Sequence, residues 1–324
     1  MADSANSTVV INLNNFAFQM NRYMSIFIIL FGSIGNTLNL FIFNRPKHRT
    51  NPCAVYFFYA SVAGLIALFS GLLSRIFAGF QRDLSATTEG LCQSRAFIVW
   101  VSTTTASWFL TYATVDRYCI SCREVNRRNL SNLRFAHHSM TLTILGVSLV
   151  FAETFYCYVP NLKNSPLTCY GRNMACRLYN EISSALFFVF IPSTIMLIFG
   201  YGTVQNVRKL LLSIAPTAST EGTARTIKKT DRQLIQMLII QIILSTIFNI
   251  PLAVHRLYLT STLTVLKSPL RTTIENLCFQ AFYLLSFMTF GMPFYIYTLT
   301  GTVFKSECRT LFQFIYRKIK LFAL

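Results

Sequence analysis

The chain has 324 residues, of which 53% are hydrophobic and 12% are charged, and its formal net charge is +18. Such an apolar composition excludes a soluble globular domain and indicates a protein surrounded mostly by lipid. The basic excess indicates contact with anionic inner-leaflet lipid and not with nucleic acid, because the charges flank apolar stretches.

Seven apolar stretches follow one another along the chain, at residues 23–44, 53–74, 96–115, 139–162, 182–207, 233–254 and 276–304. Each is long enough to cross a hydrocarbon core of about 30 Å as a helix, which takes about 20 residues. Backbone amides in lipid must be satisfied within the segment, and the alternation typical of a membrane barrel is absent. The sequence therefore predicts an all-α membrane protein with a seven-transmembrane helix bundle.

Lys and Arg gather in the loops after the first, third and fifth stretches and in the segment after the seventh. Basic loops stay on the cytoplasmic side, so the N-terminus is expected outside and the C-terminus inside. The first stretch is expected to be a signal anchor, since no early basic region or small-residue cleavage site precedes it. The sequence Asn6-Ser7-Thr8 is a glycosylation acceptor, and Asn6 would face outward.

Short motifs occur in a characteristic order along these stretches: Gly35-Asn36 in the first, Cys92 and Asp116-Arg117-Tyr118 around the third, Pro192 in the fifth, Pro251 in the sixth, and Tyr297 seven residues before Phe304-Lys305. With this series the chain resembles the rhodopsin-like (class A) G-protein-coupled receptors. The stretch around Asp231-Arg232-Gln233-Leu234, with residues 294–299, further resembles invertebrate orphan and neuropeptide receptors of the FMRFamide-like type. The resemblance implies an extracellular ligand, favours a peptide, and implies a heterotrimeric G protein as intracellular partner.

On this resemblance the chain divides into an extracellular N-terminus (1–22), a seven-transmembrane receptor domain (23–304), and a cytoplasmic amphipathic helix and tail (305–324). Delivery to the plasma membrane is expected, since the last four residues are not a retention signal. Palmitoylation of Cys308 on the amphipathic segment stays open.

The resemblance also assigns the residues of activation. An aspartate beside Arg117 can hold its guanidinium, and Asp231 lies 20 residues before Pro251, where it would lock the third helix to the sixth. The alternative is that Asp231 only solvates the end of the sixth stretch. Pro251 kinks that helix, and Asn249 stands where the family carries a tryptophan.

Tyr297 is expected to be the motif tyrosine of the seventh helix, because the spacing to Phe304 fixes the register. Counting from Pro293 instead would place Ile296 there.

The positions of the nine cysteines divide them into candidates for a disulfide and candidates for apolar fillers or free thiols. The resemblance favours a disulfide between Cys92 and Cys169, with Cys176 as the competing partner. The remaining internal cysteines are expected to be apolar fillers or free thiols: Cys53, Cys119, Cys122, Cys157 and Cys278.

Two positions in this sequence differ from receptors of known ligand class, and these differences restrict the class of ligand. Val99 stands where amine receptors carry an aspartate, and Phe287 where opsins carry the retinal lysine, so a monoamine lacks its counter-ion and a covalent chromophore is excluded. Gly64 and Ala106 replace polar residues of the usual sodium site, so neither a metal nor a cofactor is expected.

Charged residues near the outer mouth are the candidates for ligand contact, because charges at this depth are costly: Arg75, Arg95, Glu153, His255, Arg256, Arg271 and Glu275. Val99 in the third stretch is a further candidate. An arginine would grip a carboxylate of a peptide, and Glu275 a basic group. The alternative for Arg75, Arg95 and Arg271 is snorkelling to lipid headgroups. Arg256 is the strongest candidate.

Two other function classes, an intramembrane enzyme and a transporter or channel, are less well supported by the sequence. An intramembrane enzyme needs a metal cluster, a carboxylate pair or a nucleophile and base inside the bundle, but all four histidines lie at the ends of stretches. A transporter or channel needs paired intramembrane charges or repeat halves, and only Glu153 is charged within a stretch. The protein is therefore expected not to be an enzyme, and a transporter remains the alternative.

Overall fold

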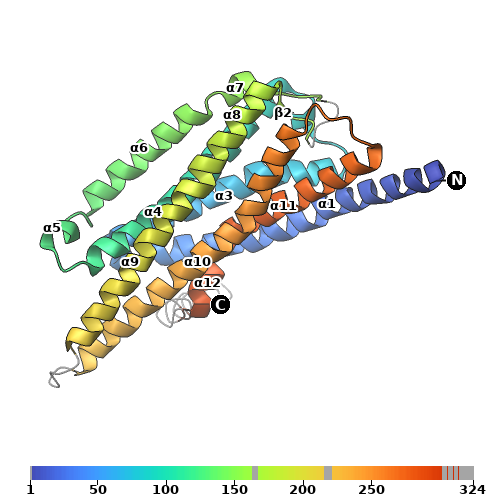
Figure 1. Ribbon diagram of the computed structural model, residues 1–324. Helices are drawn as coiled ribbons and strands as arrows, with labels where there is room; N and C mark the ends of the chain where they lie inside the picture. Colours follow the sequence, from blue (N-terminus) through green and yellow to red (C-terminus); the bar gives the residue numbers. More distant parts are fainter. Residues whose placement is uncertain are drawn as a thin grey trace, which may run out of the picture.

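The computed structural model describes residues 2–162, 167–214 and 221–300, together with Lys305, Arg309 and Gln313. Its long helices run side by side as a bundle (Figure 1). They are α1 (Ala2–Phe43), α3 (Pro52–Gly79), α4 (Glu89–Ser121), α6 (Leu133–Phe151), α8 (Met174–Ser184) continuing through the π-helix η2 (Ala185–Phe190) into α9 (Ile191–Ile214), α10 (Glu221–Ser261), and α11 (Pro269–Gly291) followed by α12 (Pro293–Thr300). The all-α class and the seven-helix bundle are confirmed.

Short elements lie in the connections: α2 (Pro46–Arg49), η1 (Leu84–Ala86), α5 (Val125–Arg128), α7 (Thr154–Cys157), and the strands β1 (Tyr158–Val159) and β2 (Tyr170–Gly171). Figure 1 places the N-terminus and β2 toward one end of the bundle and α5 at the other. We call these the outer and inner ends, following the predicted orientation. The predicted amphipathic helix after residue 304 falls outside the described residues, apart from three isolated positions.

Five helical segments among the described residues are long and apolar enough to cross a membrane: Ser7–Phe43, Pro52–Gly79, Leu133–Cys157, Met174–Lys209 and Ile239–Ser261. The other two columns, α4 and α11, are more polar. Helix α4 packs against α3, α6 and α9 at once, so many of its Ser and Thr side chains face protein. Several of their hydroxyls bond within the helix, as Thr103 and Thr114 do to the carbonyls four residues earlier. A helix surrounded by protein does not need a fully apolar surface.

Helix ends follow local capping chemistry and not the limits of hydropathy. Asn51 accepts a hydrogen bond from the Cys53 amide just before Pro52 begins α3, and Asn132 does the same for α6. Helix α1 starts at Ala2, well before the predicted start of the first apolar stretch. The polar segment ahead of that stretch is therefore helical too, although the Asn6 side chain lies outside the described residues.

The π-helix η2 precedes Pro192, which has no amide hydrogen and would clash with the carbonyl of Phe188 in a regular helix. The wider turn leaves carbonyls without intrahelical donors. Side chains of α4 supply these donors: Ser107 Oγ donates to the Phe188 carbonyl at 3.2 Å, and Trp108 Nε1 to that of Phe187 at 2.9 Å. The irregular turn thus locks the fifth helical column onto α4.

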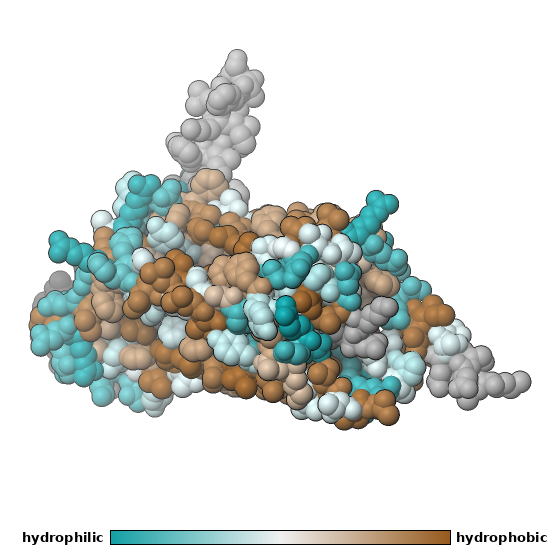
Figure 2. Space-filling view, turned by 90° about the horizontal axis from the view of Figure 1, so that it is seen from above, coloured by the Kyte–Doolittle hydropathy of each residue, from teal (hydrophilic) through white to brown (hydrophobic). Residues whose placement is uncertain are grey.

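Apolar side chains cover much of the face seen in Figure 2, and hydrophilic residues gather at its left end. Large apolar side chains on α6 and α9 point outward, such as Leu142, Leu149 and Ile198. A water-soluble protein would not leave a surface of this kind uncovered, whereas lipid covers it at no cost.

Helices α1 and α11 approach most closely at two glycines. A Cβ atom on Gly291 would lie 2.9 Å from the Cα of Gly32, which is backbone and cannot rotate away. Asn36 strengthens this contact, since its Nδ2 donates to the Phe290 carbonyl at 2.8 Å.

We expect Gly291→Ala to lower the free energy of unfolding by about 1–3 kcal/mol, because the two backbones must separate to admit a methyl group. Gly146→Ala on α6 is the matched control, since nothing lies within 4 Å of its added Cβ. Thermal unfolding of the two purified variants in one detergent tests this. Equal melting temperatures would show that α1 and α11 are not in backbone contact.

Candidate functional site

Two disulfides fasten the β1–β2 hairpin over the outer end of the bundle. Strand pairing is antiparallel, and Cys169, next to β2, is bonded to Cys92 at the start of α4. The structure therefore contains the pair that the resemblance favours. Cys157 is bonded to Cys176, which excludes the competing pairing of Cys176 with Cys92. The prediction that Cys157 is a filler or free thiol is wrong. This error arises because the hairpin turns back over α8, which spacing alone does not reveal.

A deep cavity of about 40 Å³ lies beneath this hairpin. Its wall is mostly aromatic and aliphatic and includes Tyr158, Tyr170, Phe188, Tyr283 and Phe287. Two hydroxyl side chains and two guanidinium groups also contribute to it. Three of the predicted ligand-contact residues line it: Arg95, Val99 and Arg256. No lysine is part of the lining that the structure describes.

Arg256 on α10 is the most enclosed of these residues, with 5% of its surface exposed. Its guanidinium lies 4.6 Å from the ring centre of Trp100 and 5.6 Å from that of Phe279. Its Nη1 atom is 3.6 Å from Oε2 of Glu181, which is also buried. A cation held between aromatic faces and opposite a carboxylate is well stabilised away from water.

Glu181 is the residue that the sequence analysis missed. It immediately precedes the fifth apolar stretch, where a charge is ordinarily the end of a span. In the structure its Oε1 accepts a 2.5 Å hydrogen bond from the Tyr170 hydroxyl. Burial, followed by the nearby Glu181 carboxylate, raises the pKa of Tyr170 well above its usual value, so this hydroxyl remains a donor. The hairpin, α8 and α10 are thereby joined by one polar chain.

A second chain of hydrogen bonds runs beside the first. It ends at Glu153, the charged residue of the fourth apolar stretch. The Trp100 indole donates to the Tyr158 hydroxyl at 3.1 Å, and that hydroxyl donates to Asn180 Oδ1 at 3.1 Å. The Asn180 amide then donates to Glu153 Oε1 at 3.0 Å. Glu153 therefore has a structural partner and does not contribute a paired charge to a transport path.

Arg75 and Arg95 lie close to each other beside the deep cavity. Arg75 is 7% exposed, and its guanidinium lies 4.6 Å from the ring centre of Tyr283, which lines the cavity. Arg95 Nη1 donates to Ser74 Oγ at 2.8 Å. Protein encloses Arg75, so the snorkelling alternative does not describe it.

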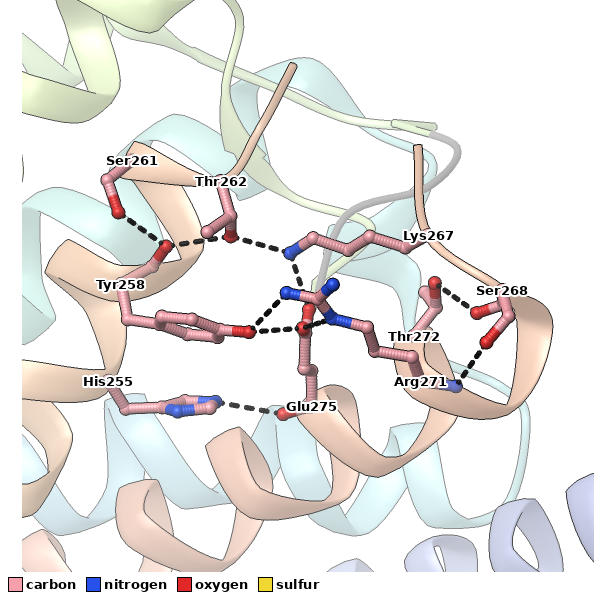
Figure 3. Close-up of polar contacts among 9 residues, drawn as sticks. All are labelled: His255, Tyr258, Ser261, Thr262, Lys267, Ser268, Arg271, Thr272 and Glu275. Atoms are coloured by element: carbon pink, nitrogen blue, oxygen red, sulfur yellow. Dashed lines mark hydrogen bonds and ion pairs between the residues drawn. The ribbon is translucent and has the colours of Figure 1, made fainter. Parts of the chain in front are cut away.

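His255 and Glu275 belong to a different cluster, shown in Figure 3, which joins the outer ends of α10 and α11. The Glu275 carboxylate accepts from Lys267 Nζ at 2.5 Å, Arg271 Nε at 2.9 Å and the Tyr258 hydroxyl at 2.7 Å. His255 Nε2 lies 2.9 Å from the Glu275 carbonyl. Glu275 is therefore engaged within the protein, and Arg271 is held by it.

A wider vestibule of about 480 Å³ opens beside this cluster. Tyr170, Arg177, Lys267 and Glu275 contribute to its wall. Tyr170 also lines the deep cavity, so this residue contributes to the walls of both spaces.

The Glu275 cluster predicts a defined pH dependence. Burial raises the pKa of Glu275, but its three donors lower it by more, so the pKa lies below its ordinary value. Its stabilising contribution, about 1 kcal/mol, is therefore complete above the unfolded-state pKa of about 4.3 and is lost as the pH falls through the folded-state value. Melting temperatures of wild type and Glu275→Gln should differ at pH 7 and converge in acid. A difference that stays constant down to pH 3 would contradict this assignment.

At the inner end of the bundle, Asp116-Arg117-Tyr118 lies near the C-terminal end of α4, which stops at Ser121. Arg117 Nη2 donates to Asn51 Oδ1 at 3.2 Å. Asp116 Oδ1 accepts from the Ser131 hydroxyl at 2.6 Å, and the Tyr118 hydroxyl accepts from Arg127 at 3.0 Å. The Asp231 side chain lies outside the described residues, so the predicted lock between it and Arg117 stays a prediction.

Between the two ends lie the remaining predicted switch residues. Pro251 lies inside α10. The Asn249 amide donates to the Ser245 carbonyl at 2.8 Å, and its Oδ1 is buried with no hydrogen-bond partner in the part of the chain described. Tyr297 on α12 is buried with its ring centre 5.0 Å from that of Phe57.

Comparison with known proteins adds two findings. Residues 35–313 match the family described as 7 transmembrane receptor (rhodopsin family). Rhodopsin of Zeus faber is 24% identical over 244 residues, covering 71% of this chain and 64% of that protein. Rhodopsin of Galeus melastomus is 24% identical over 246 residues, covering 72% and 65% respectively. The matched part thus spans just under two-thirds of the length of these relatives.

Proposed function

The chain belongs to the rhodopsin family of seven-transmembrane receptors, and on that premise we propose that it binds an extracellular ligand and activates a heterotrimeric G protein. In this proposal the receptor lies in the plasma membrane with its N-terminus outside. Residues 23–304 form the signalling bundle, preceded by an extracellular segment (1–22) and followed by a cytoplasmic helix and tail (305–324).

The observation that supports the proposal most is that one helix, α4, runs from the deep cavity at the outer end to Arg117 at the inner end. Its outer half contributes Arg95, Val99 and Trp100 to the deep cavity. Its inner end carries Arg117, which reaches across to Asn51 at the start of α3. A change at the outer cavity is therefore connected by one rigid helix to the surface that a G protein would meet.

Helix α10 is the element that we expect to move. Its outer half is held to α8 by the ion pair between Arg256 and Glu181, and Pro251 breaks one backbone hydrogen bond between that pair and the inner half. A ligand that alters the pair shifts an equilibrium between two positions of α10, and outward movement of its inner end opens the G-protein site. The proposed lock between Arg117 and Asp231 opposes this movement.

A peptide is the ligand class that we favour, following the resemblance to FMRFamide-like receptors. The vestibule of about 480 Å³ has the size of a site for several side chains, and its wall mixes charged and apolar residues. Phe287, which lines the deep cavity, cannot form a Schiff base.

Uptake of a GTP analogue tests the function directly. Membranes carrying the receptor and a purified heterotrimeric G protein should take up the analogue faster than membranes without the receptor. Arg117→Ala should remove most of that increase, whereas Arg128→Ala, at an exposed arginine of the inner connection that follows α4, should retain it. Identical uptake by wild type and Arg117→Ala would exclude this mechanism and favour the transporter or channel alternative.

A further inference from the structure

The outer half of the bundle contains more buried positive charge than negative charge. Arg75, Arg95 and Arg256 lie in or beside the deep cavity. The carboxylate within ion-pair distance of this group, among the described residues, is Glu181, and it lies opposite Arg256. Buried Arg75 and half-buried Arg95 therefore have no carboxylate within ion-pair distance in the described part of the protein, which is a costly arrangement.

Each of the three arginines also has buried N–H groups without hydrogen-bond partners. These atoms are Nε of Arg75, Nε of Arg95, and both Nε and Nη1 of Arg256. Arg256 and Arg75 are each more than nine-tenths buried, so bulk water does not reach these donors. Leaving charged buried donors without hydrogen bonds is destabilising, and an anion would satisfy several of them at once.

The space available fits a small charged group and not a whole ligand. The deep cavity has room for a few atoms, and the wall beside its two arginines is mostly apolar. It meets the much larger vestibule at Tyr170, whose hydroxyl is held by Glu181. A ligand with its body in the vestibule would reach the cavity by displacing this one ring.

We propose that the deep cavity is an anion subsite that takes a carboxylate carried by the ligand, between Arg95 and Arg256. This rests on the proposed receptor function and names the chemistry of its ligand. The ligand carboxylate competes with Glu181 for Arg256, and so loosens the contact between α8 and α10. Arg75, behind Tyr283, adds to the positive potential without touching the ligand.

Binding of phenylacetate and of its neutral amide, phenylacetamide, to the purified receptor in lipid nanodiscs tests the proposal. Both are compared by isothermal titration in one buffer. The acid is expected to bind at least about tenfold more tightly, because its carboxylate forms a charge-assisted pair with arginine that the neutral amide cannot form. Arg95→Gln should abolish this preference. Arg271→Gln should retain it, since that arginine lies at the outer cluster, outside the cavity lining. Equal affinity for acid and amide, or a preference that survives in Arg95→Gln, would overturn the proposal.

If Arg95→Gln fails to fold, the affinity of Glu181→Gln for phenylacetate tests the proposal independently. Removing the competing carboxylate should strengthen binding of phenylacetate, and unchanged or weaker binding contradicts the proposal. Two kinds of short peptide then identify the source of the carboxylate. One kind ends in a free carboxylate, and the other ends in an amide and carries one aspartate side chain; the kind that binds more tightly contains the preferred carboxylate. Loss of the acid preference with Arg117-dependent GTP-analogue uptake intact would reject the anion subsite alone, and leave the receptor function standing.

Discussion

Replacing Cys92 and Cys169 together with serine is expected to lower the free energy of unfolding by about 4–5 kcal/mol. The bond closes a loop of 77 residues, and the entropy that a cross-link removes from the unfolded chain grows with the length of that loop. Its loss also releases the hairpin that covers the deep cavity. Chemical or thermal unfolding of the purified double variant, under oxidising conditions, measures the cost.

The second disulfide supplies the internal comparison. Cys157 and Cys176 are separated by 19 residues, so removing their bond is expected to cost less, about 3 kcal/mol. Cys278→Ser is the control, because that cysteine is free and only half-buried. If both double variants melt together with Cys278→Ser, neither bond contributes to the stability of the receptor.

Replacing Arg256 alone with glutamine is expected to destabilise the protein by about 3–5 kcal/mol, because it leaves a buried carboxylate without its cation. The side chains of Arg256 and Glu181 are 6% and 2% exposed, so water cannot replace the lost partner. Adding Glu181→Gln to the same protein removes the orphaned charge. The double variant should recover most of the lost stability.

A double-mutant cycle on melting temperatures measures this coupling. Arg271→Gln serves as a matched control, since its partner Glu275 keeps two other donors. If the effects of Arg256→Gln and Glu181→Gln simply add, the two residues do not act as a pair in the folded receptor.

The sequence predicts the bundle well because lipid imposes a strong and local requirement on each span. Apolar stretches of about 20 residues bounded by charge correspond to the observed helices, and Asn51-Pro52 marks a helix start through its own capping chemistry. Helices α4 and α11 are too polar to be identified as membrane spans from hydropathy alone. Helix α4 is polar because it is surrounded by other helices, and this depends on packing that no single segment encodes.

The site is only partly predictable, because its residues meet through tertiary folding. Arg95, Val99 and Arg256 converge on one cavity as expected, whereas His255 and Glu275 lie in a separate cluster. Glu181 looks like an ordinary charge at the end of a span until α8 turns it toward Arg256.

The second disulfide was missed for a similar reason. The pairing of Cys157 with Cys176 depends on how the hairpin turns back over α8. Sequence distance does not report such a turn.

Locating the two chain termini relative to the membrane tests the account most directly, because every proposal assigns the arginine-lined cavity to the outside and Arg117 to the inside. Epitope tags at both ends, probed with antibody on intact and on permeabilised cells, give the result. We expect the N-terminal tag to be detected on intact cells and the C-terminal tag only after permeabilisation. Detection of both tags in the same compartment, or of the C-terminal tag alone on intact cells, would contradict the account.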